Sequence, residues 1–116
     1  MTTIASFTAV QRDRIELLRR ELTDRTRARV VVDYDTTDYG QHYAALCVEE
    51  LPAGAFGRPG PLVSILTGKG VMGFAAMTAD GAPLAHGVDF EEAVKAARFA
   101  GVREYRSMRK GALIAA

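Results

Sequence analysis

The stretch Leu62–Gly73, with the sequence LVSILTGKGVMG, decides how this chain is expected to fold. Its first six residues form a short apolar run of the kind that is typical of a buried β-strand. Gly68, Gly70 and Gly73 follow with the spacing G-x-G-x-x-G. That spacing is the fingerprint of a dinucleotide-binding turn, but glycines at such positions also suit the tight turn of a β-hairpin.

The rest of the chain favours the hairpin. A dinucleotide fold needs a helix directly after the glycines and several parallel strands with crossover helices. Here Gly73 would interrupt that helix, and only 27 residues follow Asp89, which stands where a ribose-binding acid is expected. A phosphate-binding loop of the Walker type is excluded, because glycine instead of Ser or Thr follows Lys69.

We therefore predict that Gly68–Gly70 is the turn of a hairpin and that Gly73 marks a bulge or a close backbone contact. The strands Leu62–Thr67 and Val71–Met77 would then pair antiparallel. A nucleotide-binding enzyme that uses the three glycines is kept as a second alternative function.

Upstream of this hairpin the pattern predicts a helix followed by two strands. Thr8 and Gln11 have the spacing of a capping box, and apolar residues then recur at helical spacing until about Arg27. From Val30 apolar residues recur at every second position, which predicts a strand. A second strand with the same alternation runs back and ends at Val48. The turn-rich residues 36–40 lie between them, and the segment Pro52–Pro61 reads as a connecting loop.

Downstream, Asp89 and Glu92 predict the start of a second helix, with Gly101 as its expected end. The last segment, Val102–Ala116, is predicted to be either a short helix or an edge strand. Together these elements predict an α+β fold in one domain, residues 1–116. An antiparallel sheet of about four strands would carry an N-terminal and a C-terminal helix packed on one face.

Composition restricts the kind of protein and its location. Cys47 is the only cysteine among 116 residues, which excludes an intramolecular disulfide and zinc sites with several thiolates. The chain does not start like a secretory signal, and no apolar run approaches the ~20 residues that span a bilayer. We therefore expect a cytoplasmic protein that does not enter a membrane.

Charge is distributed unevenly along the chain although the net charge is only +1. Residues 12–29 contain seven arginines and four acidic residues, whereas residues 30–92 contain two basic and nine acidic residues. Residues 93–116 contain six basic residues and one acidic residue. An acidic middle between two basic ends points to recognition of charged macromolecules.

The acidic residues gather in the predicted hairpin. We predict a non-enzymatic protein–protein interaction module that uses this hairpin, with no catalytic residues, cofactor or metal. An accessory or inhibitory protein of a phage or other mobile element fits this description, as does a cellular adaptor, and self-association stays open. The predicted partner-binding residues are Asp33, Asp35, Asp38, Tyr39, Tyr43, Glu49 and Glu50.

The arginine-rich ends favour an alternative function, nucleic-acid binding. Basic residues of the C-terminal segment recur at helical spacing and would form a phosphate-contacting stripe. The residues of this stripe are Arg103, Tyr105, Arg106, Arg109 and Lys110.

Overall fold

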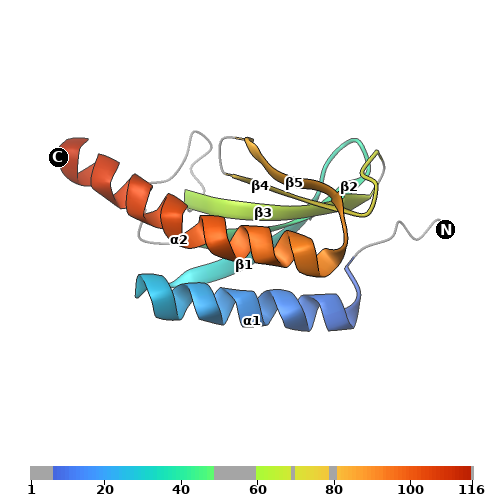
Figure 1. The fold of residues 1–116 in the computed structure, drawn as a ribbon, viewed down its shortest axis with the longest axis horizontal. Coiled ribbons are helices and arrows are strands. Elements are labelled where there is room, and N and C mark those ends of the chain that lie inside the picture. The colour runs from blue at the N-terminus through green and yellow to red at the C-terminus, as the bar shows by residue number, and fades with distance from the viewer. Residues whose placement is uncertain (1–6, 49–59, 69, 79–80, 116) are drawn as a thin grey trace.

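The computed structural model describes residues 7–48, 60–68, 70–78 and 81–115, which form two helices and one antiparallel sheet (Figure 1). Five strands follow one another in chain order across the sheet, so the predicted α+β class is confirmed with one strand more than expected. The elements are α1 (Ala9–Thr26), β1 (Val30–Thr36), β2 (Gln41–Val48), β3 (Gly60–Gly68), β4 (Phe74–Thr78), β5 (Pro83–Val88) and α2 (Phe90–Ala115).

Helix α1 begins and ends as its sequence predicts. The Thr8 hydroxyl accepts a hydrogen bond from the Gln11 backbone N–H at 3.1 Å, and the Gln11 side chain accepts one from the Thr8 N–H at 2.9 Å. This capping box satisfies two N–H groups that the helix itself leaves unpaired. At the other end Arg27 adopts a left-handed conformation, with φ 60°, and its N–H bonds to the Thr23 carbonyl.

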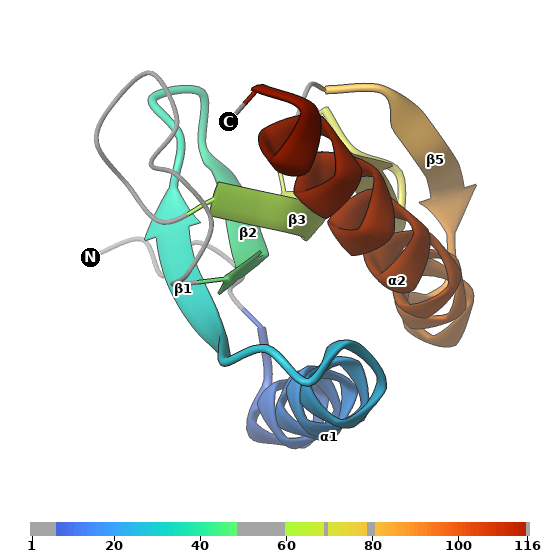
Figure 2. The ribbon, with the colours of Figure 1, turned by 90° about the vertical axis from the view of Figure 1, so that its left-hand side faces the viewer.

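The core lies between the two helices and one face of the sheet, and Figure 2 shows both helices on the same side of the strands. Side chains alternate between the faces of a strand, so every second residue of β1 and β2 points to the helices. The fully buried core side chains from helices and sheet include Ile15, Leu18, Leu22, Val30, Leu46, Val48, Ile65, Val94 and Ala97.

The three glycines of the G-x-G-x-x-G stretch connect the antiparallel strands β3 and β4, which confirms the predicted hairpin. All three have positive φ. A Cβ on Gly68 would lie 2.7 Å from the Gly40 carbonyl oxygen, and one on Gly73 would lie 2.6 Å from the Val88 carbonyl oxygen. The glycines thus let backbone segments approach each other closely, and β4 begins at Phe74 rather than at Val71.

Strand β5 was not among the predicted elements. It begins with Pro83, contains Gly87 and pairs with β4 across two irregularities of the register. Proline and glycine are tolerated at an edge, where one side of the backbone needs no partner in the sheet. The strand therefore lacks the alternating apolar pattern that reveals β1 and β2.

Helix α2 is longer than predicted. It passes through Gly101 and continues to Ala115, so the prediction that Gly101 ends the helix is wrong, and the segment from Val102 is helical. Gly101 is needed for contact rather than termination, because a Cβ there would lie 2.8 Å from Cδ2 of the buried Leu22. At the start of the helix Asp89 accepts a hydrogen bond from the Glu92 N–H at 2.8 Å, as the predicted cap requires.

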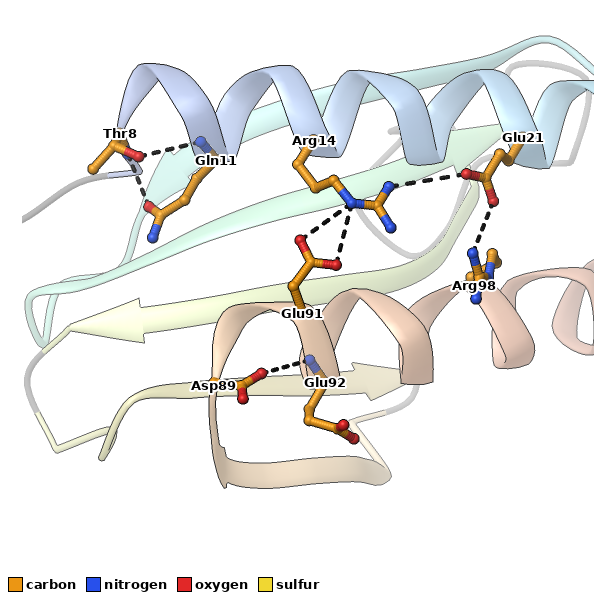
Figure 3. Close-up of polar contacts among 8 residues, drawn as sticks. All are labelled: Thr8, Gln11, Arg14, Glu21, Asp89, Glu91, Glu92 and Arg98. Atoms are coloured by element: carbon orange, nitrogen blue, oxygen red, sulfur yellow. Dashed lines mark hydrogen bonds and ion pairs between the residues drawn. The ribbon is translucent and has the colours of Figure 1, made fainter.

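The two helices run parallel, and ion pairs join them along their length (Figures 1 and 3). Nε of Arg14 on α1 donates to both carboxylate oxygens of Glu91 on α2, at 3.2 and 3.3 Å. Arg98 on α2 donates to Glu21 on α1 at 3.4 Å, and a longer contact of 3.9 Å joins Arg14 to Glu21. Charges of both signs therefore alternate across this contact.

Candidate functional site

The two ends of the elongated molecule differ in charge, because the fold gathers different charged segments of the sequence at each end. Both helices start at the end where the β1–β2 and β3–β4 turns lie, and both finish at the opposite end (Figure 1). Exposed acidic side chains predominate near the helix starts, where Arg12 is also exposed, and exposed arginines predominate near the helix ends, where Asp24 is also exposed. The acidic residues are Asp35, Asp38, Asp89, Glu91 and Glu92, and the arginines are Arg25, Arg27, Arg29, Arg103 and Arg106.

The predicted acidic hairpin is formed by β1 and β2, and β1 is an outermost strand of the described sheet. Asp33 and Asp35 are exposed and alternate with Val32 and Tyr34, so they lie on the face of β1 that the helices do not cover. Tyr43 is the cross-strand partner of Asp35 and is half-buried on the same face. Glu49 and Glu50 lie outside the described residues, as does most of the predicted Pro52–Pro61 loop.

The hairpin tip holds its two most prominent side chains on a well-bonded turn. Asp38 is exposed, and Tyr39 is 81% exposed to solvent. The backbone beneath them is closed by a hydrogen bond from the Gly40 N–H to the Thr37 carbonyl at 3.1 Å. The Thr37 hydroxyl also accepts from the Gln41 N–H at 3.2 Å. The aspartate and the tyrosine are thus presented on an ordered turn.

A cavity of about 250 Å³ lies beside the hairpin, and it is lined by the predicted Asp35 and Tyr43 together with residues that were not predicted. The Arg12 guanidinium lies 5.0 Å from the centre of the Tyr34 ring, and the ring of Phe7 packs edge-on against the same tyrosine. His42 shares a hydrogen bond of 3.1 Å with the Thr36 hydroxyl, consistent with a structural role. Partial burial raises the pKa of Tyr34, and the charge of Arg12 opposes that shift. Phe7 precedes the first element, so no periodicity could have revealed it.

The predicted basic stripe on α2 is only partly assembled. Arg103 and Arg106 are exposed, whereas Tyr105 is half-buried and packs against the core, so it does not lie beside them. The backbone of Arg109 and Lys110 continues the helix, but their side chains lie outside the described part. The aromatic residue that does accompany the arginines is Phe99, which is 75% exposed and which the sequence pattern did not single out.

Two further findings concern metals and membranes. Within residues 7–48, 60–68, 70–78 and 81–115, no three His, Cys, Asp or Glu side chains are grouped closely enough to hold a metal ion. Neither described helix combines the length and the apolar character required to cross a bilayer. Cys47 is buried, as its apolar neighbours predict.

Comparison with known proteins gives no match: no protein-family model, no curated protein and no solved structure matches this chain.

Proposed function

We propose that this protein is a non-enzymatic interaction module that binds a basic segment of another protein through the β1–β2 hairpin. The observation that carries this proposal is the exposure of Tyr39 at 81% next to the exposed Asp38, at the tip of a strand that also exposes Asp33 and Asp35. Tyrosine is enriched at protein interfaces, where its ring buries apolar area and its hydroxyl retains a polar partner.

The edge position of β1 favours an extended partner. An extended segment can add to a sheet edge through backbone hydrogen bonds, while its alternate side chains supply specificity. Asp33 and Asp35 lie two residues apart on one face of β1, the spacing at which lysines or arginines of an added strand would meet them. The same aspartates disfavour pairing with uncharged or acidic strands, because charged side chains on an edge oppose indiscriminate association.

Charge favours a basic partner in particular. Residues 30–48 contain three aspartates and no lysine or arginine. Exposed charges interact over a Debye length of about 10 Å at moderate salt, so the aspartates would act chiefly on the rate of encounter and on selectivity. An accessory or inhibitory protein of a mobile element and a cellular adaptor both fit a surface of this kind.

The proposal is tested with a fluorescent extended peptide in which lysine alternates with threonine or valine. We expect binding that weakens as salt is raised, and a loss of about tenfold in affinity for the Asp35→Asn/Asp38→Asn variant, because two such charges contribute about 1–2 kcal/mol. Asparagine keeps the oxygen that accepts from the Thr36 N–H, so the strand end retains its hydrogen bond.

The matched control is Asp24→Asn/Glu92→Gln, which removes two exposed acidic charges elsewhere without touching the hairpin. Equal losses in both variants, or equal binding of a glutamate-containing peptide, would contradict the proposal. Tyr39→Ala provides a second test, and it should lower the affinity without changing the salt dependence.

A further inference from the structure

The outer face of α2 carries a row of exposed side chains that runs from the second turn of the helix toward its C-terminal half. Lys95, Phe99, Arg103 and Arg106 are spaced by four, four and three residues, which places them on one face of a helix. All four are exposed. The buried side of the helix, which includes Ala93, Val94, Ala97 and Ala100, points the other way toward the core. We call the four exposed residues the α2 stripe.

The centre of the α2 stripe is an aromatic ring next to a cation. Phe99 is 75% exposed, and the Arg103 guanidinium lies 5.9 Å from its ring centre. Arg103 forms one ion-pair contact among the described residues, with Glu104, and this contact is long at 4.0 Å. Lys95 and Arg106 form no ion pair among the described residues. The cations of the α2 stripe are therefore available to an external anion.

We propose that the α2 stripe binds single-stranded nucleic acid, which goes beyond the protein contact assigned to the hairpin. Sites of this kind combine cations that follow the phosphate backbone with exposed aromatic rings on which unpaired bases stack. Lys95, Arg103 and Arg106 supply the cations, and Phe99 supplies the ring between them. A duplex keeps its bases stacked inside, so the ring would contribute little to binding duplex.

The surroundings of Arg103 and Arg106 fit a long polyanion, whereas the exposed Glu91 and Glu92 lie within about one turn of Lys95. Figure 1 shows the last turns of α2 projecting past the sheet, and the four stripe residues that precede these turns are exposed. The end of α1 lies at the same end of the molecule and exposes Arg25 and Arg27. These charges add to the positive potential that steers a nucleic acid toward the helix.

The binding test uses fluorescence anisotropy with labelled oligo(dT) of about 20 nucleotides, longer than one site of about 4–16 nucleotides. We expect oligo(dT) or oligo(rU) to bind more tightly than a duplex of equal length. Three phosphate contacts on a single strand give a salt slope of about −2, so affinity should fall about fifteenfold between 50 and 200 mM salt. Comparing oligo(dT) with oligo(rU) then shows whether DNA or RNA is preferred.

Variants separate stacking from charge. Phe99→Ala should lower the affinity for oligo(dT) about tenfold and leave the salt slope unchanged. Arg103→Gln/Arg106→Gln should lower the affinity and flatten the slope by more than one unit. Met72→Ala, which removes an equally exposed apolar side chain, and Arg12→Gln/Arg20→Gln, which removes two other exposed arginines, are the matched controls. These controls should keep most of the affinity.

A spectroscopic variant reports the stacking directly. The chain contains no tryptophan, so the Phe99→Trp variant carries a single indole at the proposed stacking site. Its fluorescence should be quenched by oligo(dT) and not by heparin, a polyanion without bases. Phe99 is largely exposed, so neither substitution at this position should disturb the core, and circular dichroism checks that the fold is retained.

Three results would overturn the assignment: no binding of oligo(dT) at low salt, duplex binding as tight as single-strand binding, or heparin and oligo(dT) responding equally to Phe99→Ala. The two proposals fail separately, because Asp35→Asn/Asp38→Asn should weaken peptide binding about tenfold while leaving oligo(dT) binding intact. Loss of both activities in that variant would count against the assignment to α2.

Discussion

Gly101 of α2 lies against Leu22 of α1, so closely that a Cβ on the glycine would come within 2.8 Å of Leu22 Cδ2 and 3.2 Å of Cδ1. Leu22 is fully buried and cannot swing into solvent. The absence of a side chain at this one position lets the two helices pack closely, although glycine lowers the intrinsic stability of a helix interior by about 1 kcal/mol.

We predict that Gly101→Val destabilises the protein by about 2 kcal/mol, because overpacking a tight contact costs about 1–3 kcal/mol. Leu22→Ala should cost about 2–5 kcal/mol through the cavity it leaves. The double variant should lose less than the sum of the two, because the valine occupies part of that cavity. Urea denaturation of the four proteins measures this coupling, and strictly additive losses would show that the two side chains do not meet.

The glycines of the β3–β4 turn should respond unequally to substitution. Gly70→Ala meets open space and should lose only the roughly 1–2 kcal/mol associated with positive φ. Gly68→Ala and Gly73→Ala meet backbone oxygens at 2.7 and 2.6 Å in addition, so each should lower the melting temperature further. Similar melting temperatures for all three variants would contradict the close backbone approach.

The ion pairs between the helices should contribute modestly and unequally. Glu21 contacts both Arg14 and Arg98 and its side chain is 29% exposed, whereas Glu91 contacts only Arg14 among the described residues and its side chain is 65% exposed. Glu21→Gln should therefore destabilise more than Glu91→Gln, with neither exceeding about 1 kcal/mol. The difference should shrink at high salt in thermal unfolding. Glu92→Gln serves as the control at an exposed acid that forms no described ion pair.

The raised pKa of Tyr34 predicts a late phase in an alkaline titration. Burial favours the neutral phenol, so this tyrosine should ionise at a higher pH than a tyrosine in water. A pKa that is higher in the folded state contributes stability below the unfolded value and loses it as pH rises through the folded value. Absorbance at the tyrosinate band should show the late phase vanish in Tyr34→Phe, and Arg12→Gln should shift it to still higher pH.

Much of the fold could be predicted because local signals agreed with the tertiary structure. The Thr8–Gln11 capping box and the helical spacing of Ile15, Leu18 and Leu22 are complete within α1 itself. The β3–β4 turn could be predicted because the chain after Asp89 is too short for a dinucleotide fold. By contrast, Gly101 misled the prediction, since its role depends on Leu22, which is distant in sequence.

Less of the candidate sites could be predicted. Alternation placed Asp33 and Asp35 on one face of a strand, which the register of β1 confirms. The prediction that Tyr105 lies beside the arginines was wrong, because residues that are adjacent in sequence, such as Tyr105 and Arg106, do not lie on one face of a helix. Phe99 was assigned no role, since its exposure depends on which side of α2 the sheet and α1 cover. The binding roles of these residues stay predictions.

The ion pairs between the helices also favour one position of α2 along α1. Arg14 pairs with Glu91 and Glu21 pairs with Arg98, so both contacts join residues 77 positions apart and both steps along the helices are seven residues. The order of signs is reversed between the helices. Sliding α2 by two turns in the direction that brings Arg98 toward Arg14 would set like charges against each other. Modest pairs can thus favour the same alignment of the two helices that the close contact between Leu22 and Gly101 requires, even where they add little to the stability of the aligned state.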